Sequence, residues 1–413
     1  MLSVKNSGGA SVYPKTLTVT GIKTSYTAGQ TVDLTGLKAT VMYSDDSSED
    51  VSDAVTASPT SGTMIYEDTT KITFSWNCPD DETVVLTSDV AVTVTRVLSS
   101  ISVSAPTKTI YYKGDALDLS GAVVTATFNS GRTEVVTSSA TFSPANGSTL
   151  SSFGAQTVTA SYTENGITKT ATTSVTVTVK TVTWASGTDT EIANMVEAAD
   201  EGIISLSDYW TVGDSRSVSL SAMPAKGVGE SHSAQTADFV LMNKGGKTLA
   251  SGSTCSFVVG MKNCLATTGY MNSSDTNSGG WNSCKRRTWC NSVFYDAIPS
   301  TLRPIFKQFE NVTASGTSTS TTTSTDYFAL PSEKEVFGSV TYANSTAESS
   351  NSQFAWYKTS SNRVKRVNGS SNDWWERSPT SGTSGRFCVF GFDGSANYTD
   401  ARSTTGISPF GCI

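Results

Sequence analysis

The sequence predicts a mostly β protein with two copies of a small β-sandwich followed by an α+β domain. Charged residues make up only 16% of the 413 residues, against roughly 25% in typical soluble proteins. Ser and Thr replace them, in short β-branched runs that favour strands. The first 180 residues contain an internal repeat, and the pattern changes after residue 181. These three observations set the predicted fold class and the order of its domains.

The repeat has a period of 85 residues, since "DLTG" at 33–36 returns as "DLSG" at 118–121. Segments such as "LKATVMYSD" alternate apolar and polar side chains and run into hairpin turns, as half-buried antiparallel strands do. A period of this length suits an independent domain of about seven short strands. The predicted segments are an N-terminal arm at 1–16 and sandwich domains at 17–98 and 99–180.

Two long segments carry a family resemblance: "LTVTGIKTSYTAGQTVDLTGLKATVMYSDDSSEDV" and "ISVSAPTKTIYYKGDALDLSGAVVTATFNSGRTEVV". They resemble bacterial immunoglobulin-like (Ig-like) domains, and the resemblance covers residues 17–180. Such domains usually act as spacers or adhesive stalks on cell surfaces and virions, so we expect no chemistry in them. The disulfide of antibody domains is absent, because Cys78 is the single cysteine of this region.

The third predicted domain, 181–413, mixes short helices and strands. Helical spacing of apolar residues and a capping box supply the helix signals. Its predicted elements are a helix over 189–202 with Ile192, Met195, Val196 and Ala199 on its inner face, strands over 208–221 and 237–244, a helix around Trp289, Val293 and Phe294, a Ser/Thr-rich hairpin or loop over 311–332, and a short helix capped by Ser332 and Glu335.

This domain also carries motifs in a recognisable order: "GGWNSCKRRTWCNSVFYDAIPSTLR", "YFALPSEKEVFG", "WWERSP" and "GISPFGCI". Over about 205–413 it resembles an uncharacterised domain family of gut Firmicutes and their phages. That arrangement is in turn similar to the C-type-lectin-like fold of phage receptor-binding proteins, which implies a C-type-lectin-like α+β domain. Ser408 stands where those proteins usually have an arginine, so the terminal strand needs a different anchor here.

The residues favour no enzyme chemistry. The only histidine, His232, lies in a polar stretch and is interpreted as solvated, so no Ser/His or Cys/His dyad is expected. The acid pairs Asp373 with Glu376 and Asp393 with Asp400 are more typical of turns and caps than of a glycosidase. We expect no catalytic residue and no cofactor.

Metal binding is not expected either. The sequence has no CxxC and no zinc-type Cys/His spacing, and the "EPN" or "QPD" motif of calcium-dependent lectins is missing. The seven cysteines are expected to be reduced thiols, and their odd number leaves at least one unpaired in any intramolecular scheme.

The stretch "NDWWERSP" at 372–379 is the first candidate binding segment. Strand alternation sends Trp374 and Trp375 to opposite faces, so one should lie in the core and the other half exposed or under a loop. A purely structural role for both tryptophans is favoured, and ligand recognition by the less buried one is the alternative. Arg377 is expected to form a structural ion pair with Glu376 or Asp373.

The tail from 386 to 406 is the second candidate segment, because Tyr, Ser, Gly, Asn and Arg are the residues that dominate antibody paratopes. An ordinary surface hairpin is the alternative. The candidate ligand-binding residues from both segments are Trp374, Arg386, Phe390, Phe392, Asn397, Tyr398, Asp400 and Arg402.

Charge and hydropathy limit the partners. The net charge is −7 with a pI near 4.9, so nucleic-acid binding is not expected. The basic cluster at 285–287 is interpreted as a solvated helix end. No run approaches the ~18 apolar residues of a membrane span. The first 16 residues lack the apolar core of an export signal, which favours release by lysis.

These observations and the resemblance together predict a non-enzymatic phage virion protein. Its lectin-like tip would bind a host-cell surface receptor or glycan, and its N-terminal region would contact other virion proteins. A homotrimer is expected from the usual symmetry of fibres. Two alternatives remain: a structural head or tail component without receptor binding, and an adhesin on the bacterial cell surface.

Overall fold

A computed structural model describes residues 11–413 of the protein. The chain divides into two compact units between Thr178 and Val179. Most of the predicted arm at 1–16 lies outside the described residues, and strand β1 begins at Pro14. The structure is mostly β, as the composition predicts.

The first unit contains the two repeats. The strands of the first repeat are β1 (Pro14–Thr20), β2 (Ser25–Thr27), β3 (Lys38–Tyr43), β4 (Ser48–Asp50), β5 (Thr56–Ser58), β6 (Lys71–Asn77), β7 (Val85–Ala91) and β8 (Thr93–Thr95). Those of the second are β9 (Leu98–Val103), β10 (Ile110–Tyr112), β11 (Val124–Phe128), β12 (Thr133–Val135), β13 (Thr141–Ser143), β14 (Gly154–Glu164) and β15 (Ile167–Thr178).

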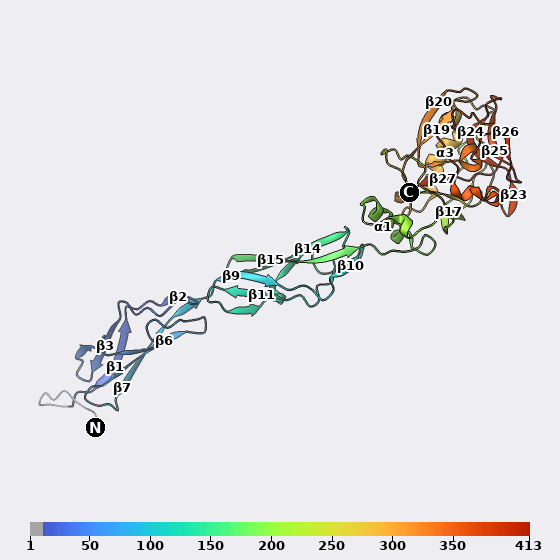
Figure 1. Ribbon diagram of the computed structural model, residues 1–413. Helices are drawn as coiled ribbons and strands as arrows, with labels where there is room; N and C mark the ends of the chain where they lie inside the picture. The colour runs from blue at the N-terminus through green and yellow to red at the C-terminus, as the bar shows by residue number, and fades with distance from the viewer. Residues whose placement is uncertain (1–10) are drawn as a thin grey trace. The chain divides into compact units, whose positions relative to one another are not determined.

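The two repeats share one topology. In the first, β1-β3-β4 forms one sheet and β5-β6-β7 the other, while β2 pairs in parallel with β8. In the second, β12-β11-β9 lies against β10-β15-β14-β13, and Figure 1 shows the long β14–β15 hairpin beside β9 and β11. Apolar side chains of both sheets meet in a core that includes Phe74 and Trp76 in the first repeat and Phe128 in the second.

The repeated "DLTG" and "DLSG" motifs are turns. Asp33 Oδ1 accepts the N–H of Thr35 at 2.9 Å, and Asp118 Oδ1 accepts that of Ser120 at the same distance. This local bond is the one by which Asp initiates turns. The final glycine of each motif has a φ of 86° or 85°, a conformation that glycine adopts without strain. The motif therefore recurs because the same turn recurs.

The second unit is built around a five-stranded sheet in the order β16-β17-β18-β27-β21. Its strands are β16 (Ser215–Leu220), β17 (Gln235–Lys244), β18 (Phe257–Met261), β27 (Phe410–Cys412) and β21 (Phe328–Ala329). The other strands are β19 (Phe309–Ala314), β20 (Thr321–Asp326), β22 (Lys365–Val367), β23 (Ser370–Asn372), β24 (Trp374–Pro379), β25 (Arg386–Phe390) and β26 (Ala396–Asp400).

The α-helices of this unit are short. They are α1 (Asp189–Asp200), α2 (Gly280–Ser283), α3 (Lys285–Trp289), α4 (Tyr295–Ala297) and α5 (Glu333–Phe337). Helix α3 continues through a π turn, Cys290–Phe294, into α4. Short 3₁₀ turns cover Leu206–Asp208, Arg303–Ile305, Ala355–Lys358 and Ser360–Arg363. In residues 11–413, no helix is long and apolar enough to cross a membrane.

Helix α1 confirms the prediction over 189–202, with an earlier end. Thr188 and Glu191 form a reciprocal capping box at its start, which satisfies two backbone donors that a helix leaves free. Gly202 follows with a φ of 73°. The buried face includes Ala198 instead of the predicted Ala199.

The motif "GGWNSCKRRTWCNS" is explained by a buried carboxylate at the end of β20. Asp326 is fully buried. Its two oxygens accept hydrogen bonds from Trp281 Nε1 (2.9 Å), Arg287 Nε (2.6 Å), Asn291 Nδ2 (2.9 Å), Asn311 Nδ2 (2.9 Å) and Ser324 Oγ (2.7 Å). A buried charge is tolerated only when it is paired and hydrogen-bonded, so this motif holds the β19–β20 hairpin against the helices.

Two predictions of solvent exposure are wrong. Within the cluster at 285–287, Arg286 is fully buried, and its guanidinium donates to Tyr270 O at 2.9 Å. His232 is only 2% exposed and lies 5.4 Å from the ring of Trp289. Burial and the nearby Arg286 charge lower the pKa of His232 to about 4. Both side chains are therefore part of the core.

A buried lysine helps to anchor the terminal strand. Ser408 Oγ donates to Met261 O at 3.1 Å. Lys365 Nζ, from strand β22, donates to the same carbonyl and to Lys262 O at 3.4 Å. Burial lowers the pKa of Lys365 to about 7. The amine of Lys365 and the hydroxyl of Ser408 therefore donate to one carbonyl, that of Met261.

Candidate functional site

Both predicted binding segments form one three-stranded antiparallel sheet, β24-β25-β26. Strand β25 is central, and Arg386 pairs with Asp400 at one end and Phe390 with Ala396 at the other. All six residues of β24 are buried, whereas β26 has no buried residue. Figure 1 shows these strands side by side in the C-terminal unit. Whether these two segments can contact a ligand therefore depends on what covers each face of this sheet.

Both tryptophans of "NDWWERSP" are core residues, as the structural interpretation predicts, and the half-exposed position considered for one of them is wrong. Trp374 and Trp375 have no exposed surface. The Trp374 ring lies 3.9 Å from that of Phe390, and its Nε1 donates to Arg363 O at 2.9 Å. Trp375 Nε1 donates to Gly269 O at 2.6 Å. Trp374 and Phe390 are thus closed to a ligand, because other side chains cover both faces of β24.

Arg377 forms a structural ion pair, but its partner is Glu335 instead of Glu376 or Asp373. Its Nη2 lies 2.9 Å from Glu335 Oε1, and its Nη1 contacts Oε2. Lys247 Nζ reaches the same carboxylate at 2.9 Å. Burial alone would raise the pKa of Glu335, yet Arg377 and Lys247 hold it at about 2. Glu335 also caps α5, so the pair joins that helix to the sheet.

The two acids of the first pair, Asp373 and Glu376, lie in different surroundings. Glu376 is fully buried, and neither of its oxygens has a hydrogen-bond partner among the described residues. Burial, with Glu333 and Glu348 nearby, raises the pKa of Glu376 well above its ordinary value. Asp373 instead accepts the N–H of Phe392 at 2.7 Å, which holds the end of the β25–β26 hairpin.

A small pocket lies beside Tyr398, at the outer edge of this sheet. Its volume is about 250 Å³. The rings of Tyr398 and Tyr342 meet edge to face, with centroids 4.9 Å apart and planes at 71°. The lining residues are Thr341, Tyr342, Thr380, Ser381, Gly382, Thr383 and Tyr398. Of the described residues that line it, none is charged, and most carry a hydroxyl group.

Two buried polar residues position the pocket wall. Asn277 is 1% exposed, and its amide donates to Thr383 O and Arg386 O, each at 2.9 Å. Glu333 accepts the backbone N–H of Tyr342 at 3.0 Å, and burial raises the pKa of Glu333. The loop that carries the hydroxyl groups and the segment that carries Tyr342 are thus each held by hydrogen bonds between a buried side chain and their main chain.

The remaining predicted residues surround this pocket or lie apart from it. Arg386 Nε is 2.8 Å from Asp400 Oδ1, and its guanidinium lies 5.1 Å from the Tyr398 ring. Phe392 is 64% exposed at the far end of the hairpin. The structure therefore brings Arg386, Tyr398 and Asp400 together.

Two polar residues of the prediction remain on the surface. Asn397 is exposed beside Tyr398, and its Oδ1 accepts the Tyr398 N–H at 2.8 Å. Arg402 is also exposed, and its backbone N–H is bound by Asp275 Oδ1 at 2.9 Å.

Sequence reasoning missed Tyr342, Asn277 and Glu333. Tyr342 follows α5 after a short Gly-Ser segment, where a single tyrosine has no periodic pattern around it. Asn277 lies in "SSDTNSGG", which is typical of a loop. The one usable signal was the density of Thr, Ser and Gly in "SPTSGTSG", which supplies the hydroxyl groups of the pocket.

Comparisons with known proteins identify two parts of the chain. Residues 104–179 match the bacterial Ig-like domain (group 3), and residues 258–413 match a domain of unknown function (DUF6273). No curated protein matches the chain. In residues 11–413, no group of three His, Cys, Asp or Glu side chains is placed to hold a metal ion. The Ig-like match thus falls on the second repeat, whose strands correspond to those of the first.

Proposed function

We propose that the C-terminal unit is a non-enzymatic recognition domain of the C-type-lectin-like kind, and that it binds a neutral glycan through the Tyr342–Tyr398 pocket. The observation that carries this proposal is the lining: two aromatic rings at a steep angle, surrounded by hydroxyl groups, without a charged side chain among the described lining residues. Aromatic faces supply apolar contact area and hydroxyl groups adapt their hydrogen bonds. A sugar ring has the matching apolar and hydroxyl surfaces.

The size of the pocket supports contact with a single sugar ring. At about 250 Å³, it is smaller than the roughly 300–1,000 Å³ of drug-sized ligand sites. It would accept one terminal sugar ring, with the rest of the glycan lying along β26. The Ig-like repeats would then act as the stalk. The order of motifs in residues 205–413 supports a place on a phage virion, with a host-cell surface glycan as the partner.

A glycan array and intact candidate host cells test this proposal with the full-length protein. Tyr398→Ala removes one wall of the pocket, and we expect binding to weaken at least about tenfold, as for an anchoring aromatic residue. Tyr209→Ala is the matched control, because Tyr209 has a similar exposure, 42% against 37%, and does not line the pocket.

Saturable binding that is lost in Tyr398→Ala and kept in Tyr209→Ala would support recognition at this pocket. Equal binding by both variants would exclude the pocket as the site. Absence of binding by the folded wild-type protein would favour the alternative, a structural virion component.

A further inference from the structure

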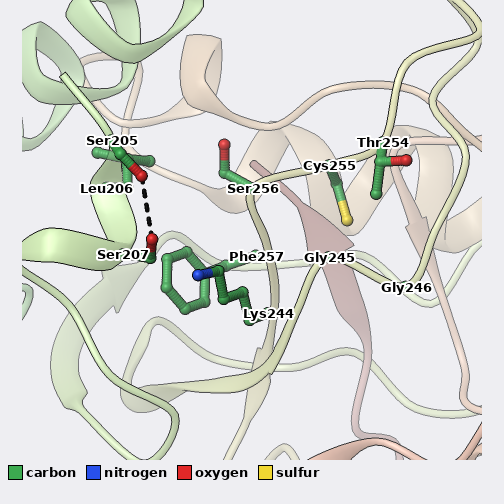
Figure 2. Close-up of a pocket in the computed structure, with 10 residues that line it drawn as sticks. All are labelled: Ser205, Leu206, Ser207, Lys244, Gly245, Gly246, Thr254, Cys255, Ser256 and Phe257. Carbon is green, nitrogen blue, oxygen red and sulfur yellow. Dashed lines mark hydrogen bonds between the residues drawn. The ribbon is translucent and has the colours of Figure 1, made fainter.

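A second pocket, separate from the Tyr342–Tyr398 pocket, is lined by a cysteine. It holds about 510 Å³ and lies between the Leu206 turn, the end of β17 and the segment that leads into β18. Figure 2 shows the sulfur of Cys255 pointing toward Gly245 and Gly246. Lys244 and Thr254 on the rim are exposed, so the pocket is open to solvent. Cys255 itself is 3% exposed and forms part of the wall.

Cys255 has a second thiol beside it. The side chains of Cys255 and Cys412 lie close enough that each influences the pKa of the other. The main chain holds the two segments together, because Ser256 N–H donates to Ile413 O at 2.7 Å. Cys412 is fixed from its other side, where its carbonyl accepts the N–H of Lys307 at 2.8 Å. Both cysteines are free thiols.

Cys255 differs from the other buried thiols of this unit, including Cys412, whose pKa burial raises well above its ordinary value. The neighbouring Cys412 lowers the pKa of Cys255 against the effect of burial, and the Lys247 charge adds to this. Burial instead raises the pKa of Cys264 and of Cys284 to about 12. Since the thiolate is the attacking species, Cys255 is the favoured nucleophile.

We propose that Cys255 and Cys412 are a redox-responsive thiol pair, which a small disulfide of the glutathione type entering this pocket converts into an intramolecular disulfide. The Cys255 thiolate attacks one sulfur of glutathione disulfide, and one glutathione leaves as its thiolate. Cys412 loses its proton to solvent and attacks the Cys255 sulfur, which releases the second glutathione. Two protein thiols are oxidised and one disulfide is reduced to two glutathione thiols.

The bond would fasten β27 covalently. This strand is the last of the chain and lies between β18 and β21 in the five-stranded sheet. A reducing cytosol keeps such a pair open, and an oxidising exterior closes it. The unit would therefore fold with free thiols and gain a covalent link after release.

The test places the full-length protein in glutathione buffers of increasing oxidised fraction, blocks free thiols with iodoacetamide, and maps the peptides by mass spectrometry without reduction. We expect a Cys255–Cys412 cross-link as the main product, and a rise of roughly 5–10 °C in the thermal midpoint of the C-terminal unit. Cys388→Ser, which changes a buried thiol outside the pair, should leave both results unchanged.

Single variants separate the two steps. Cys412→Ser lacks the second thiol, so a mixed disulfide with glutathione should accumulate on Cys255. Cys255→Ser should give neither product. If wild-type Cys255 stays open to iodoacetamide in the most oxidising buffer, or links to another cysteine, the proposal is wrong. The wild-type map decides this even if a serine variant fails to fold.

Discussion

Replacing Arg377 with methionine removes a guanidinium from the buried contact with Glu335 while it keeps much of the side-chain volume. The carboxylate would keep Lys247 as its single cationic partner. The bond from Arg377 Nη1 to Leu330 O, 3.0 Å long, would also be lost. Breaking one side of a buried ion pair leaves a poorly compensated charge, and this typically costs about 3–5 kcal/mol.

The pKa of Glu335 gives an independent magnitude. It is held at about 2 against an ordinary value of 4.5, and each unit corresponds to ~1.4 kcal/mol. Ionisation of Glu335 therefore stabilises the fold by about 3 kcal/mol, after the cost of its burial is subtracted from the gain from the two cations. Because the folded-state pKa is depressed, this contribution is present above pH 4.5 and is lost as the pH falls toward 2. Arg377→Met should lower the free energy of unfolding at pH 7. It should also make the loss of that free energy between pH 4.5 and pH 2 smaller than in the wild type.

Urea unfolding followed by tryptophan fluorescence measures this effect, since seven of the eight tryptophans lie in residues 179–413. Arg386→Met is the matched control, because it removes the same charge from the partly exposed pair with Asp400 in the adjacent strand. We expect no measurable shift of its urea midpoint, since surface pairs contribute little. Equal shifts in the two variants, or a loss below about 1 kcal/mol in Arg377→Met, would refute the reasoning.

Three further predictions concern other buried polar groups. Glu376→Gln should stabilise the C-terminal unit at neutral pH. Burial raises the folded-state pKa of Glu376, so the free energy of unfolding of the wild-type protein falls as the pH rises above 4.5, by up to ~1.4 kcal/mol per pH unit. Urea midpoints of both proteins at pH 5 and pH 7 check this prediction. A difference between variant and wild type that is the same at both pH values would contradict it. The pKa of Lys365 is lowered from 10.5 to about 7, so between these pH values the unfolded chain binds one more proton than the folded chain and the wild-type protein becomes more stable as the pH rises. Lys365→Met should remove this rise in stability. A pH profile of stability parallel to that of the wild type would count against the prediction. Asn277→Ala should remove one of two donors from the carbonyl groups of Thr383 and Arg386, which keep their bonds from Thr380. We expect a loss of about 1–3 kcal/mol in the free energy of unfolding. The glycan affinity of Asn277→Ala should fall, as that of Tyr398→Ala should. Full affinity in a destabilised Asn277→Ala protein would show that Asn277 does not position the binding pocket.

Local signals in the sequence predicted the elements that depend on local chemistry. The predicted capping box at Ser332 uses a partner three residues away, so the pattern itself contains the interaction. The capping box at Thr188 and the turns at Asp33 and Asp118 are equally local, but the sequence predicted only the helix over 189–202 and the repeat that contain them. The mostly β class followed from composition and alternation, and the Ig-like domain of the second repeat followed from the resemblance of its sequence to that family.

Burial at long range could not be predicted in this way. Alternation along β24 assigns Trp374 and Trp375 to opposite faces, but it does not say that Tyr357 and Phe390 cover one of them. Arg286 and His232 look polar in sequence, and only the fold brings them into the core. The pocket residues Tyr342 and Tyr398 are far apart in the chain, so their meeting depends on the same long-range packing.

Strand β26 has a consequence for how this protein can change. Its neighbour β25 is buried at four of five positions, whereas no residue of β26 is buried. Main-chain pairing with β25 and the bond from Asn397 to the Tyr398 N–H hold its shape. Substitutions at exposed surface positions usually alter stability by less than about 0.5 kcal/mol. The side chains of this strand can therefore be replaced, by selection or in a designed library, on a scaffold that keeps its fold.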